Sequence, residues 1–219
     1  MIVQAYELLR SDLVTGRIRP GAKLNVTRMA AELGFSLGAV RESLSRLTAE
    51  GLVEAEPQRG FRASPVSLED LDDLVEARAL VLGACARQAV ERGDVAWESR
   101  IVAAHHALSR TGITRGLEKW EVLHDEFHDA LLAACTNRYL RHMCDALYVR
   151  GSRYRYLAIP LAGPKGRDVK GEHRDLMESA LSRDPKGFAE ALVAHNDRTT
   201  AAVREWLLEN GDLVEPGER

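Results

Sequence analysis

Apolar residues recur every three or four positions along most of the chain, which is the spacing of one face of an α-helix. In the first such stretch, residues 3–15, the apolar face consists of Val3, Tyr6, Leu9 and Leu13. Gly16, Pro20 and Gly21 follow it and end the helix. The pattern therefore predicts a mainly helical protein that begins with an amphipathic helix.

Two more short helices are predicted before residue 51. Asn25 is a suitable N-cap for the first of them, and Gly34 provides the glycine at which that helix ends. The second begins at Ser36, another capping residue, and continues to about Glu50. Its inner, apolar face consists of Val40, Leu44 and Leu47.

Alternation typical of strands appears only after these helices. Residues 52–55 (LVEA) and 61–64 (FRAS) alternate, and the turn-forming residues 57–60 (PQRG) separate them, as in a two-stranded hairpin. The order of helix, glycine turn, helix and hairpin is that of a winged helix-turn-helix, whose helix after the turn enters the major groove of DNA.

The rest of the chain shows no clear alternation and reads as helices alone. Ser67 can cap a helix whose apolar series starts at Leu71, with Asp70 in its first turn. Further helices are predicted at residues 95–110, 114–135, 137–157, 167–182 and 185–209, with short connections except around 160–166. We expect an all-helical bundle of about six helices over residues 66–219, following a winged helix-turn-helix domain over residues 1–65.

The charge of the chain becomes informative only when residues 1–65 and residues 66–219 are counted separately. The whole chain of 219 residues is 45% apolar and carries a net charge of −3, which by itself is untypical of a nucleic-acid-binding protein. Residues 1–65 hold 9 basic and 7 acidic residues, a net charge of +2, whereas residues 66–219 hold 21 and 26, a net charge of −5. The small basic excess thus lies in the part with the helix-turn-helix pattern.

Two further observations bear on location. No apolar run approaches the roughly 20 residues that a membrane span needs, so no membrane partner is expected. Cys85, Cys135 and Cys144 are an odd number of cysteines without the spacing of a metal site, which favours a reducing cytoplasm.

The N-terminal residues resemble the GntR family of bacterial transcription regulators. The resemblance covers nearly all of residues 1–65, in the family's order. It rests on GRIRPGAKL at residues 16–24, VRESLSRL at residues 40–47, EGLV at residues 50–53 and QRGF at residues 58–61. Residues 45–47 together with residues 58–62 look like the branch that contains the carbon-starvation-induced repressor.

The resemblance implies DNA-contacting residues, with two departures. Leu37 and Thr27 stand where family members commonly have arginine, so an operator sequence cannot be carried over from relatives. The candidate DNA-binding residues are Arg28, Ser36, Arg41, Arg46, Arg59, Gly60 and Arg62. Surface solvation explains any single arginine about equally well, but Arg41 lies inside the motif and is favoured as a DNA contact. An arginine can hold a phosphate or the edge of guanine.

The C-terminal residues resemble the FCD effector domain of the FadR-type GntR subfamily. The matching landmarks are LHDEFH at residues 123–128, CTNRYL at residues 135–140, EH at residues 172–173 and ALSRD at residues 180–184. The resemblance implies a divalent metal held by His124, His128, His173 and His195.

The first of these ligands departs from the family, which usually has aspartate where this chain has His124. Asp125 is an alternative first ligand, and an ordinary surface histidine pair is the alternative to a site. Four neutral imidazoles favour zinc or nickel over magnesium or calcium and leave the full charge of the ion to attract an anion.

No HExxH or comparable catalytic signature accompanies these histidines. The resemblance implies instead that the metal helps bind a small carboxylate effector. The candidate effector-binding residues are Arg78, Arg150, Arg153 and Tyr154. The predicted function is a homodimeric, sequence-specific regulator, a repressor released from double-stranded operator DNA by its effector. The alternatives are a metal-dependent enzyme acting on organic acids and a dimeric DNA-binding protein without an effector.

Overall fold

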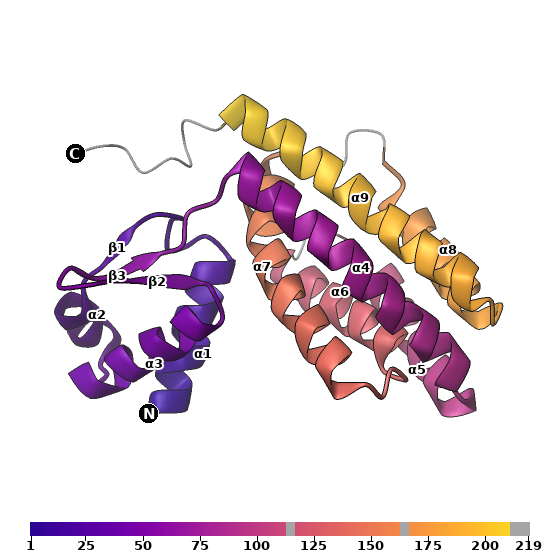
Figure 1. The fold of residues 1–219 in the computed structure, drawn as a ribbon, viewed down its shortest axis with the longest axis horizontal. Coiled ribbons are helices and arrows are strands. Elements are labelled where there is room, and N and C mark those ends of the chain that lie inside the picture. Colours follow the sequence, from indigo (N-terminus) through magenta and orange to yellow (C-terminus); the bar gives the residue numbers. More distant parts are fainter. Residues whose placement is uncertain (113–116, 163–166, 211–219) are drawn as a thin grey trace. The chain divides into compact units, whose positions relative to one another are not determined.

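The computed structural model describes residues 1–112, 117–162 and 167–210 (Figure 1). The elements of the N-terminal part are α1 (Ile2–Val14), β1 (Lys23–Leu24), α2 (Val26–Leu33), α3 (Leu37–Ala49), β2 (Val53–Glu56) and β3 (Gly60–Ala63). The helices that follow are α4 (Leu68–Arg92), α5 (Val95–Ser109), α6 (Leu117–Leu132), α7 (Arg138–Ala162), α8 (Val169–Leu181) and α9 (Pro185–Asn210). The predicted fold class, a winged helix-turn-helix followed by six helices, is confirmed in these residues.

The helix-turn-helix is formed by local capping. The Asn25 side chain accepts a hydrogen bond from the Arg28 amide at 3.0 Å and so starts α2. Gly34 ends α2 in the left-handed conformation, with φ of +71°, which residues with a Cβ rarely adopt. Ser36 then accepts a hydrogen bond from the Ala39 amide at 3.2 Å and starts α3 only two residues later.

Apolar side chains from α1, α3 and the sheet form one core. Leu9, Leu44, Leu47 and Leu52 are fully buried in it, as the predicted inner faces of the helices require. Burying a leucine contributes roughly 1.5–3 kcal/mol, so each of these side chains stabilises this part of the chain substantially.

The wing is a three-stranded antiparallel sheet with the order β1-β3-β2. Val53 pairs with Ala63 and Glu56 with Gly60, so the strands lie within one residue of the predicted hairpin. The short strand β1 was not predicted. It pairs with the free edge of β3, where Lys23 lies opposite Arg62. A strand of only two residues is too short to show an alternation of apolar and polar positions in the sequence.

The helices of the C-terminal part agree with the predicted number, with corrected ends. Helix α6 ends at Leu132 rather than at residue 135, because a turn follows in which the Cys135 amide donates to the Leu132 carbonyl at 2.9 Å. Helix α7 continues to Ala162 instead of ending at residue 157. Residues 114–116, 163–166 and 211–219, to which predicted elements or domain ends extended, lie outside the described residues.

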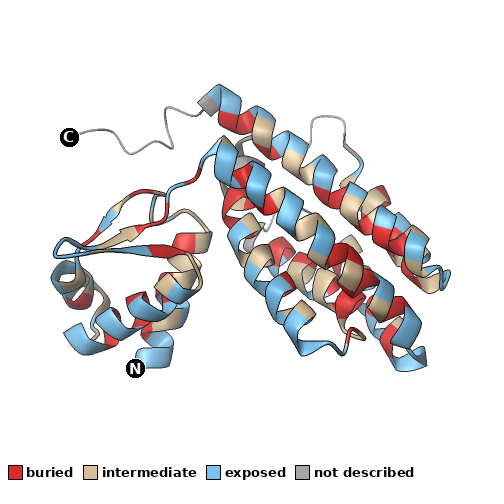
Figure 2. Cartoon of the chain, in the orientation of Figure 1, coloured by how far each residue is buried: buried red, intermediate tan, exposed pale blue. Residues whose placement is uncertain are grey.

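A second apolar core lies among these helices. Its largest fully buried side chains include Phe127, Leu131, Leu176 and Phe188, and Figure 2 shows the buried residues along the inner sides of the helices. Helix α5 packs against α6 and α8. The histidines of α6 and α8 lie next to this core.

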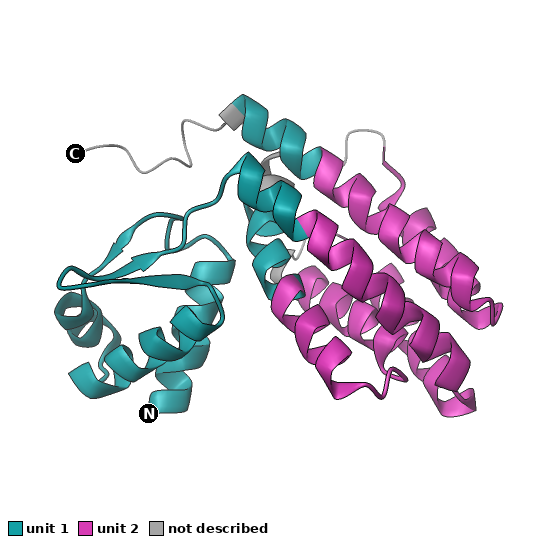
Figure 3. Ribbon diagram, viewed as in Figure 1, with its two compact units in different colours: residues 1–74, 148–161, 202–219 teal, residues 75–147, 162–201 magenta. Residues whose placement is uncertain are grey.

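The contacts divide the chain into two compact units, which are coloured separately in Figure 3. Unit 1 comprises residues 1–74, 148–161 and 202–219, and unit 2 comprises residues 75–147 and 162–201. Unit 1 therefore contains a segment of α7 in addition to the winged helix-turn-helix. None of the helices in the described residues is long and apolar enough to cross a bilayer.

Candidate metal centre and nucleic-acid interface

Four histidines from three helices meet in unit 2. His124 and His128 lie one turn apart on α6, His173 lies on α8 and His195 on α9. One ring nitrogen from each lies within 4.8 Å of those of the other three. We call this set the histidine cluster. It contains all four residues that the resemblance implied as ligands.

Packing orients the rings toward one point. His173 belongs to the buried face of α8, together with Leu176 and Ala180. Its ring lies 5.5 Å from that of Phe127, the core residue that precedes His128 on α6. Since His124 and His128 are four residues apart, the inward face of α6 presents both of them to His173, with ring centroids 5.1 and 5.5 Å away.

A carboxylate outside the cluster holds one of the rings. Glu172 Oε2 lies 2.8 Å from His195 Nδ1, which leaves His195 Nε2 as the nitrogen available to an ion. Arg167 holds Glu172 in turn through two hydrogen bonds of 2.6 Å. Burial disfavours the charged carboxylate, but the hydrogen bonds and charges of Arg167 and His195 outweigh it and lower the pKa of Glu172 to about 2. Glu172 belongs to a landmark of the family resemblance, but the sequence alone did not predict that its carboxylate holds the His195 ring.

The histidines of the cluster are suited to bind a cation. Burial lowers the pKa of His173 to about 3 and that of His195 to about 4, so both imidazoles are neutral at physiological pH and keep a lone pair. His173 Nε2 is buried and has no hydrogen-bond partner in the described part of the chain. An ion at the centre of the cluster would satisfy this nitrogen, so the residues present fit a divalent metal.

The positions of His124 and Asp125 differ in a way that bears on which of them is the first metal ligand. His124 is buried and its nitrogen groups with the other three histidines, whereas Asp125 groups with Glu121 and His124. The Asp125 carboxylate lies 3.5 Å from His124 Nδ1, in the position of a residue that orients this ring.

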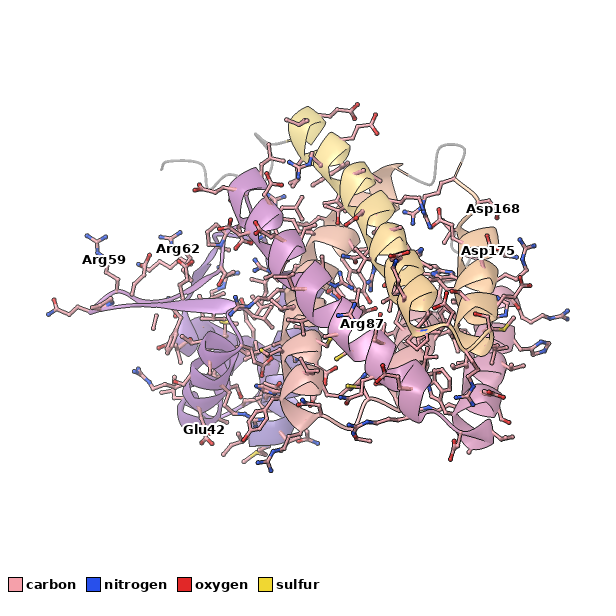
Figure 4. The ribbon with its side chains drawn as sticks, turned by 45° about the vertical axis from the view of Figure 1, so that its right-hand side comes forward. Glu42, Arg59, Arg62, Arg87, Asp168 and Asp175 are labelled. Atoms are coloured by element: carbon pink, nitrogen blue, oxygen red, sulfur yellow. The ribbon has the colours of Figure 1, made fainter. Side chains whose placement is uncertain are left out.

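A cavity of about 220 Å³ borders the cluster at His173. Arg167 and Lys170 bring positive charge to its wall, and Trp120 and Leu108 bring apolar surface. The complete lining is His105, Leu108, Ser109, Thr111, Trp120, Arg167, Asp168, Val169, Lys170 and His173. Asp168, labelled in Figure 4, caps the start of α8 through the Gly171 amide. Three separate segments form this lining, so sequence spacing could not reveal it.

Three of the four predicted effector-binding residues lie in the other unit. Arg150 Nε donates to the Glu50 carbonyl at 3.2 Å, and the buried Arg153 guanidinium donates to the Ser64 carbonyl. The Tyr154 hydroxyl donates to Asp70 at 2.5 Å. These side chains thus hold unit 1 together, and the structure does not place them in the unit of the histidine cluster. Arg78 lies in unit 2, where its charge acts on Cys144.

The outer face of α3 carries two of the predicted DNA contacts. Val40, Leu44 and Leu47 face the core, which leaves Arg41 and Arg46 exposed. Arg46 is stacked on the ring of Tyr6, 4.1 Å from its centroid. In the described residues, the Arg41 guanidinium makes no hydrogen bond or ion pair and is available to a ligand.

The wing carries three further candidates, Arg59, Gly60 and Arg62, of which the two arginines are labelled in Figure 4. Arg59 lies at the exposed tip of the wing beside Gly60, whose φ of +96° forms part of the turn. Arg62 is half-buried and is held by Glu56 at 2.8 Å and by the Gly21 carbonyl at 2.5 Å. Its guanidinium therefore stabilises the sheet, whereas that of Arg59 extends from it.

The two remaining candidates lie at the helix starts. Ser36 uses its hydroxyl as the N-cap of α3, and Arg28 forms an exposed ion pair with Glu32 at 2.8 Å. Leu37, in the place of a common family arginine, is 54% exposed and presents apolar surface at the start of α3.

Two family descriptions match the chain. "Bacterial regulatory proteins, gntR family" matches residues 2–62, and "FCD domain" matches residues 73–198, more than half of the chain. The chain belongs to the gntR family of bacterial regulatory proteins. Its FCD region contains the whole histidine cluster.

Relatives of this GntR-family protein are named as regulators. The "Uncharacterized HTH-type transcriptional regulator BphR" of Paraburkholderia xenovorans is 36% identical over 214 residues, covering 95% of this chain and 87% of the relative. The "HTH-type transcriptional repressor GlaR" of Escherichia coli is 30% identical over 200 residues, covering 88% and 91%. The GntR-family protein is accordingly a DNA-binding transcriptional regulator, and the enzyme alternative is set aside.

Solved structures agree on the fold of this GntR-family regulator. The E. coli McbR/YncC structure matches with a TM-score of 0.81 and 21% identity, covering 94% of this chain and 97% of that chain. A putative transcriptional regulator GntR from Rhodococcus sp. RHA1 matches with a TM-score of 0.73 and 19% identity, covering 93% and 97%.

We expect the metal-free GntR-family regulator to lose stability as the pH falls from about 7 to about 5. The ordinary histidine pKa is 6.5, whereas His173 and His195 resist protonation in the fold down to about pH 3 and about pH 4. The unfolded chain therefore binds more protons below pH 6.5, and the free energy of unfolding falls by up to about 1.4 kcal/mol per pH unit for each histidine.

Urea unfolding of chelator-treated protein across this pH range measures the effect. The exposed His106 provides the control, because His106→Gln should leave the pH dependence unchanged. Equal free energies of unfolding at both ends of the range would contradict the prediction.

Proposed function

We propose that this regulator is a repressor whose binding to operator DNA is controlled by a small carboxylate bound beside a metal ion in the FCD region. The observation that carries the proposal is the histidine cluster, in which the buried imidazoles of His173 and His195 are neutral, and an adjoining cavity that has cationic groups on its wall. Residues 1–65 supply the DNA-binding module in this proposal, and residues 66–219 supply the effector-binding and dimerisation domain.

Arg41 and Arg59 are the strongest candidates for direct DNA contact, because both are exposed and neither guanidinium is hydrogen-bonded within the described chain. Arg28 and Arg46 can contribute charge near the phosphates, Ser36 and Gly60 can contribute backbone amides, and Arg62 shapes the wing. Since the net charge of this module is only +2, binding should depend on a few specific contacts more than on bulk attraction.

Zinc and nickel are the ions that fit the histidine cluster best, because borderline divalent ions prefer imidazole nitrogen. His124, His128, His173 and His195 would hold the ion, and Glu172 would keep the His195 ring in place. When bound, the ion supplies an uncompensated positive charge that attracts a carboxylate. Neutral ligands leave this charge undiminished.

We place the effector in the cavity next to His173. Its wall joins the cluster to the positive side chains of Arg167 and Lys170, and its volume suits a small mono- or dicarboxylate. The earlier candidates Arg150, Arg153 and Tyr154 have roles inside unit 1, and Arg78 stays a prediction as an effector ligand.

The proposed regulator acts as a homodimer on a two-fold operator. A helix-turn-helix dimer reads two half-sites about one helical turn apart. A carboxylate that binds one arrangement of the dimer more tightly shifts the population toward it, and by the same factor changes the affinity for DNA. The operator is released if, in the favoured arrangement of the dimer, the distance between the two copies of α3 does not match the spacing of the two half-sites.

The experiment that tests this function combines a ligand screen with DNA binding. Zinc-loaded, tag-free protein is screened by thermal shift against mono-, di- and tricarboxylates, and each hit is added to a gel shift on the protein's own promoter region. We expect a carboxylate that both stabilises the protein and releases the DNA. Failure of every carboxylate to stabilise the protein would favour the effector-free dimer, and no sequence-selective retardation would contradict a repressor.

We expect Glu172→Gln to weaken metal binding about 10- to 100-fold, the usual effect of removing a residue that orients a histidine ligand. The amide keeps the shape of the side chain but loses the negative charge that makes the His195 imidazole a better donor. Competition with a chromophoric zinc chelator measures the affinity. The exposed Glu178 of the same helix provides the control Glu178→Gln, and equal affinities of the two variants would contradict the assigned role of Glu172.

A further inference from the structure

The three cysteines of the chain converge on one point in unit 2, and none of them belongs to the histidine cluster or to the lining of its cavity. Cys85 lies on α4, Cys135 lies between α6 and α7, and Cys144 lies on α7. The sulfur of Cys85 is 3.2 Å from that of Cys144 and 3.6 Å from that of Cys135. The fold thus brings Cys85 into direct sulfur contact with Cys135 and Cys144, which lie 50 and 59 positions further along the sequence.

The surroundings of the three thiols differ, which gives them different chemistry. Cys85 is completely buried at the centre, and Cys144 is 6% exposed. The Cys135 thiol donates a hydrogen bond to the side-chain oxygen of Gln88 at 3.2 Å, which holds it in place. The hydrogen bond between Cys144 and Cys85 and the nearby charge of Arg141 outweigh burial and lower the pKa of Cys144, whereas the pKa values of Cys85 and Cys135 are raised. Cys144 is therefore the thiol that ionises first.

We propose that Cys85 and Cys144 form an oxidant-sensitive dithiol site, in which hydrogen peroxide converts the two thiols to an intrachain disulfide that thiol reductants reverse. The geometry carries this assignment, because the two sulfurs need to approach by only about 1.2 Å to reach the 2.05 Å of a disulfide. The site is independent of the histidine cluster and of the proposed effector.

The chemistry proceeds in two balanced steps. The Cys144 thiolate attacks one oxygen of hydrogen peroxide, the O–O bond breaks, and the leaving hydroxide takes up a proton to give water and a sulfenic acid on Cys144. The Cys85 sulfur then attacks the Cys144 sulfur, the S–O bond breaks, and the hydroxyl leaves with the Cys85 proton as a second water. In total the two thiols lose two electrons and two protons, and one peroxide is reduced to two waters.

The disulfide would join α4 to α7 and close a loop of 59 residues. Closing a loop of this size restricts the unfolded chain, so the oxidised protein should melt at a higher temperature than the reduced protein. The ordinary role of buried cysteines, packing as small apolar residues, predicts no such rise and no change in thiol number.

The decisive experiment treats the reduced, full-length protein with hydrogen peroxide, blocks the remaining thiols with N-ethylmaleimide in denaturant and determines the intact mass. We expect two of the three thiols to escape the label, and non-reducing peptide mapping to identify a link between Cys85 and Cys144. Dithiothreitol should restore all three labels and the original melting temperature.

Two variants sharpen the test. Cys135→Ser is the matched control, since it removes a thiol of the same cluster and should leave the disulfide intact. Cys85→Ser removes the second thiol and should leave a sulfenic acid on Cys144 that dimedone traps. Three labelled thiols after peroxide treatment of the wild-type protein, a link between Cys85 and Cys135, or a link between two chains would each overturn the proposal.

Discussion

Replacing His173 with alanine should lower the metal content of the zinc-loaded, tag-free protein from about one equivalent per chain to less than about a tenth. His173 is one of the four proposed ligands, and its ring centroid lies 5.1 Å from that of His124 on α6 and 4.9 Å from that of His195 on α9. Its removal leaves three imidazoles and a gap that water enters. Elemental analysis after extensive dialysis measures the content.

The same variant should lose the stabilisation that metal gives. A ligand at 100 times its dissociation constant stabilises the folded state by about 2.7 kcal/mol, so zinc should raise the melting temperature of the wild-type protein but not that of the variant. His173→Gln keeps most of the side-chain volume and separates loss of the ligand from loss of packing. The control is His106→Ala, which removes an exposed histidine of the same unit. A His173→Ala protein that retains a full equivalent would contradict the assigned centre.

Replacing Arg41 with alanine should weaken operator binding about 5- to 150-fold for each half-site, which corresponds to the roughly 1–3 kcal/mol of a specific arginine contact. Arg41 lies on the exposed face of α3, and its guanidinium has no hydrogen bond or ion pair with the described residues. Fluorescence anisotropy on a sequence selected in vitro from random DNA measures the affinity. Arg87→Ala removes the same charge from an exposed position of unit 2, labelled in Figure 4, and should change binding less than about twofold.

The salt dependence of the Arg41→Ala protein distinguishes two ways of binding. If Arg41 binds a phosphate, affinity should fall on all DNA sequences, and the slope of log K against log salt should decrease by about one for each phosphate that is no longer neutralised. If it binds guanine, only the selected sequence should bind more weakly. Unchanged affinity for both kinds of DNA would contradict the proposed reading surface.

Local patterns predicted most of the fold, and the reason is visible in particular residues. Asn25, Gly34 and Ser36 act within four residues of their own positions, so the helix-turn-helix follows from sequence alone. Strand β1 could not be predicted, because its two residues are a strand only through pairing with residues nearly 40 positions away. The end of α6 was misplaced for a similar reason, since Cys135 belongs to an apolar series but lies in a turn.

The candidate site was predictable where helical spacing and family resemblance agreed. The spacing of His124 and His128 places both on one face, and the resemblance added His173 and His195. Arg150 and Arg153, whose local spacing suits a carboxylate, stay predictions as effector ligands. In the fold their guanidinium groups donate to the carbonyls of Glu50 and Ser64, which lie far away in the sequence, and no local pattern indicates these contacts. The role of Glu172 depends on the neighbouring helix and has no local signal.

The segment Tyr148–Leu161 of α7 has a consequence for protein engineering. Val149 packs against the apolar core of the helix-turn-helix, and Arg153 binds the carbonyl of Ser64 at the end of the sheet. A fragment ending at residue 65 would expose part of that core and leave the Ser64 carbonyl without this donor. Chimeras that exchange DNA specificity between relatives should therefore transplant this stretch of α7 together with the winged helix-turn-helix domain.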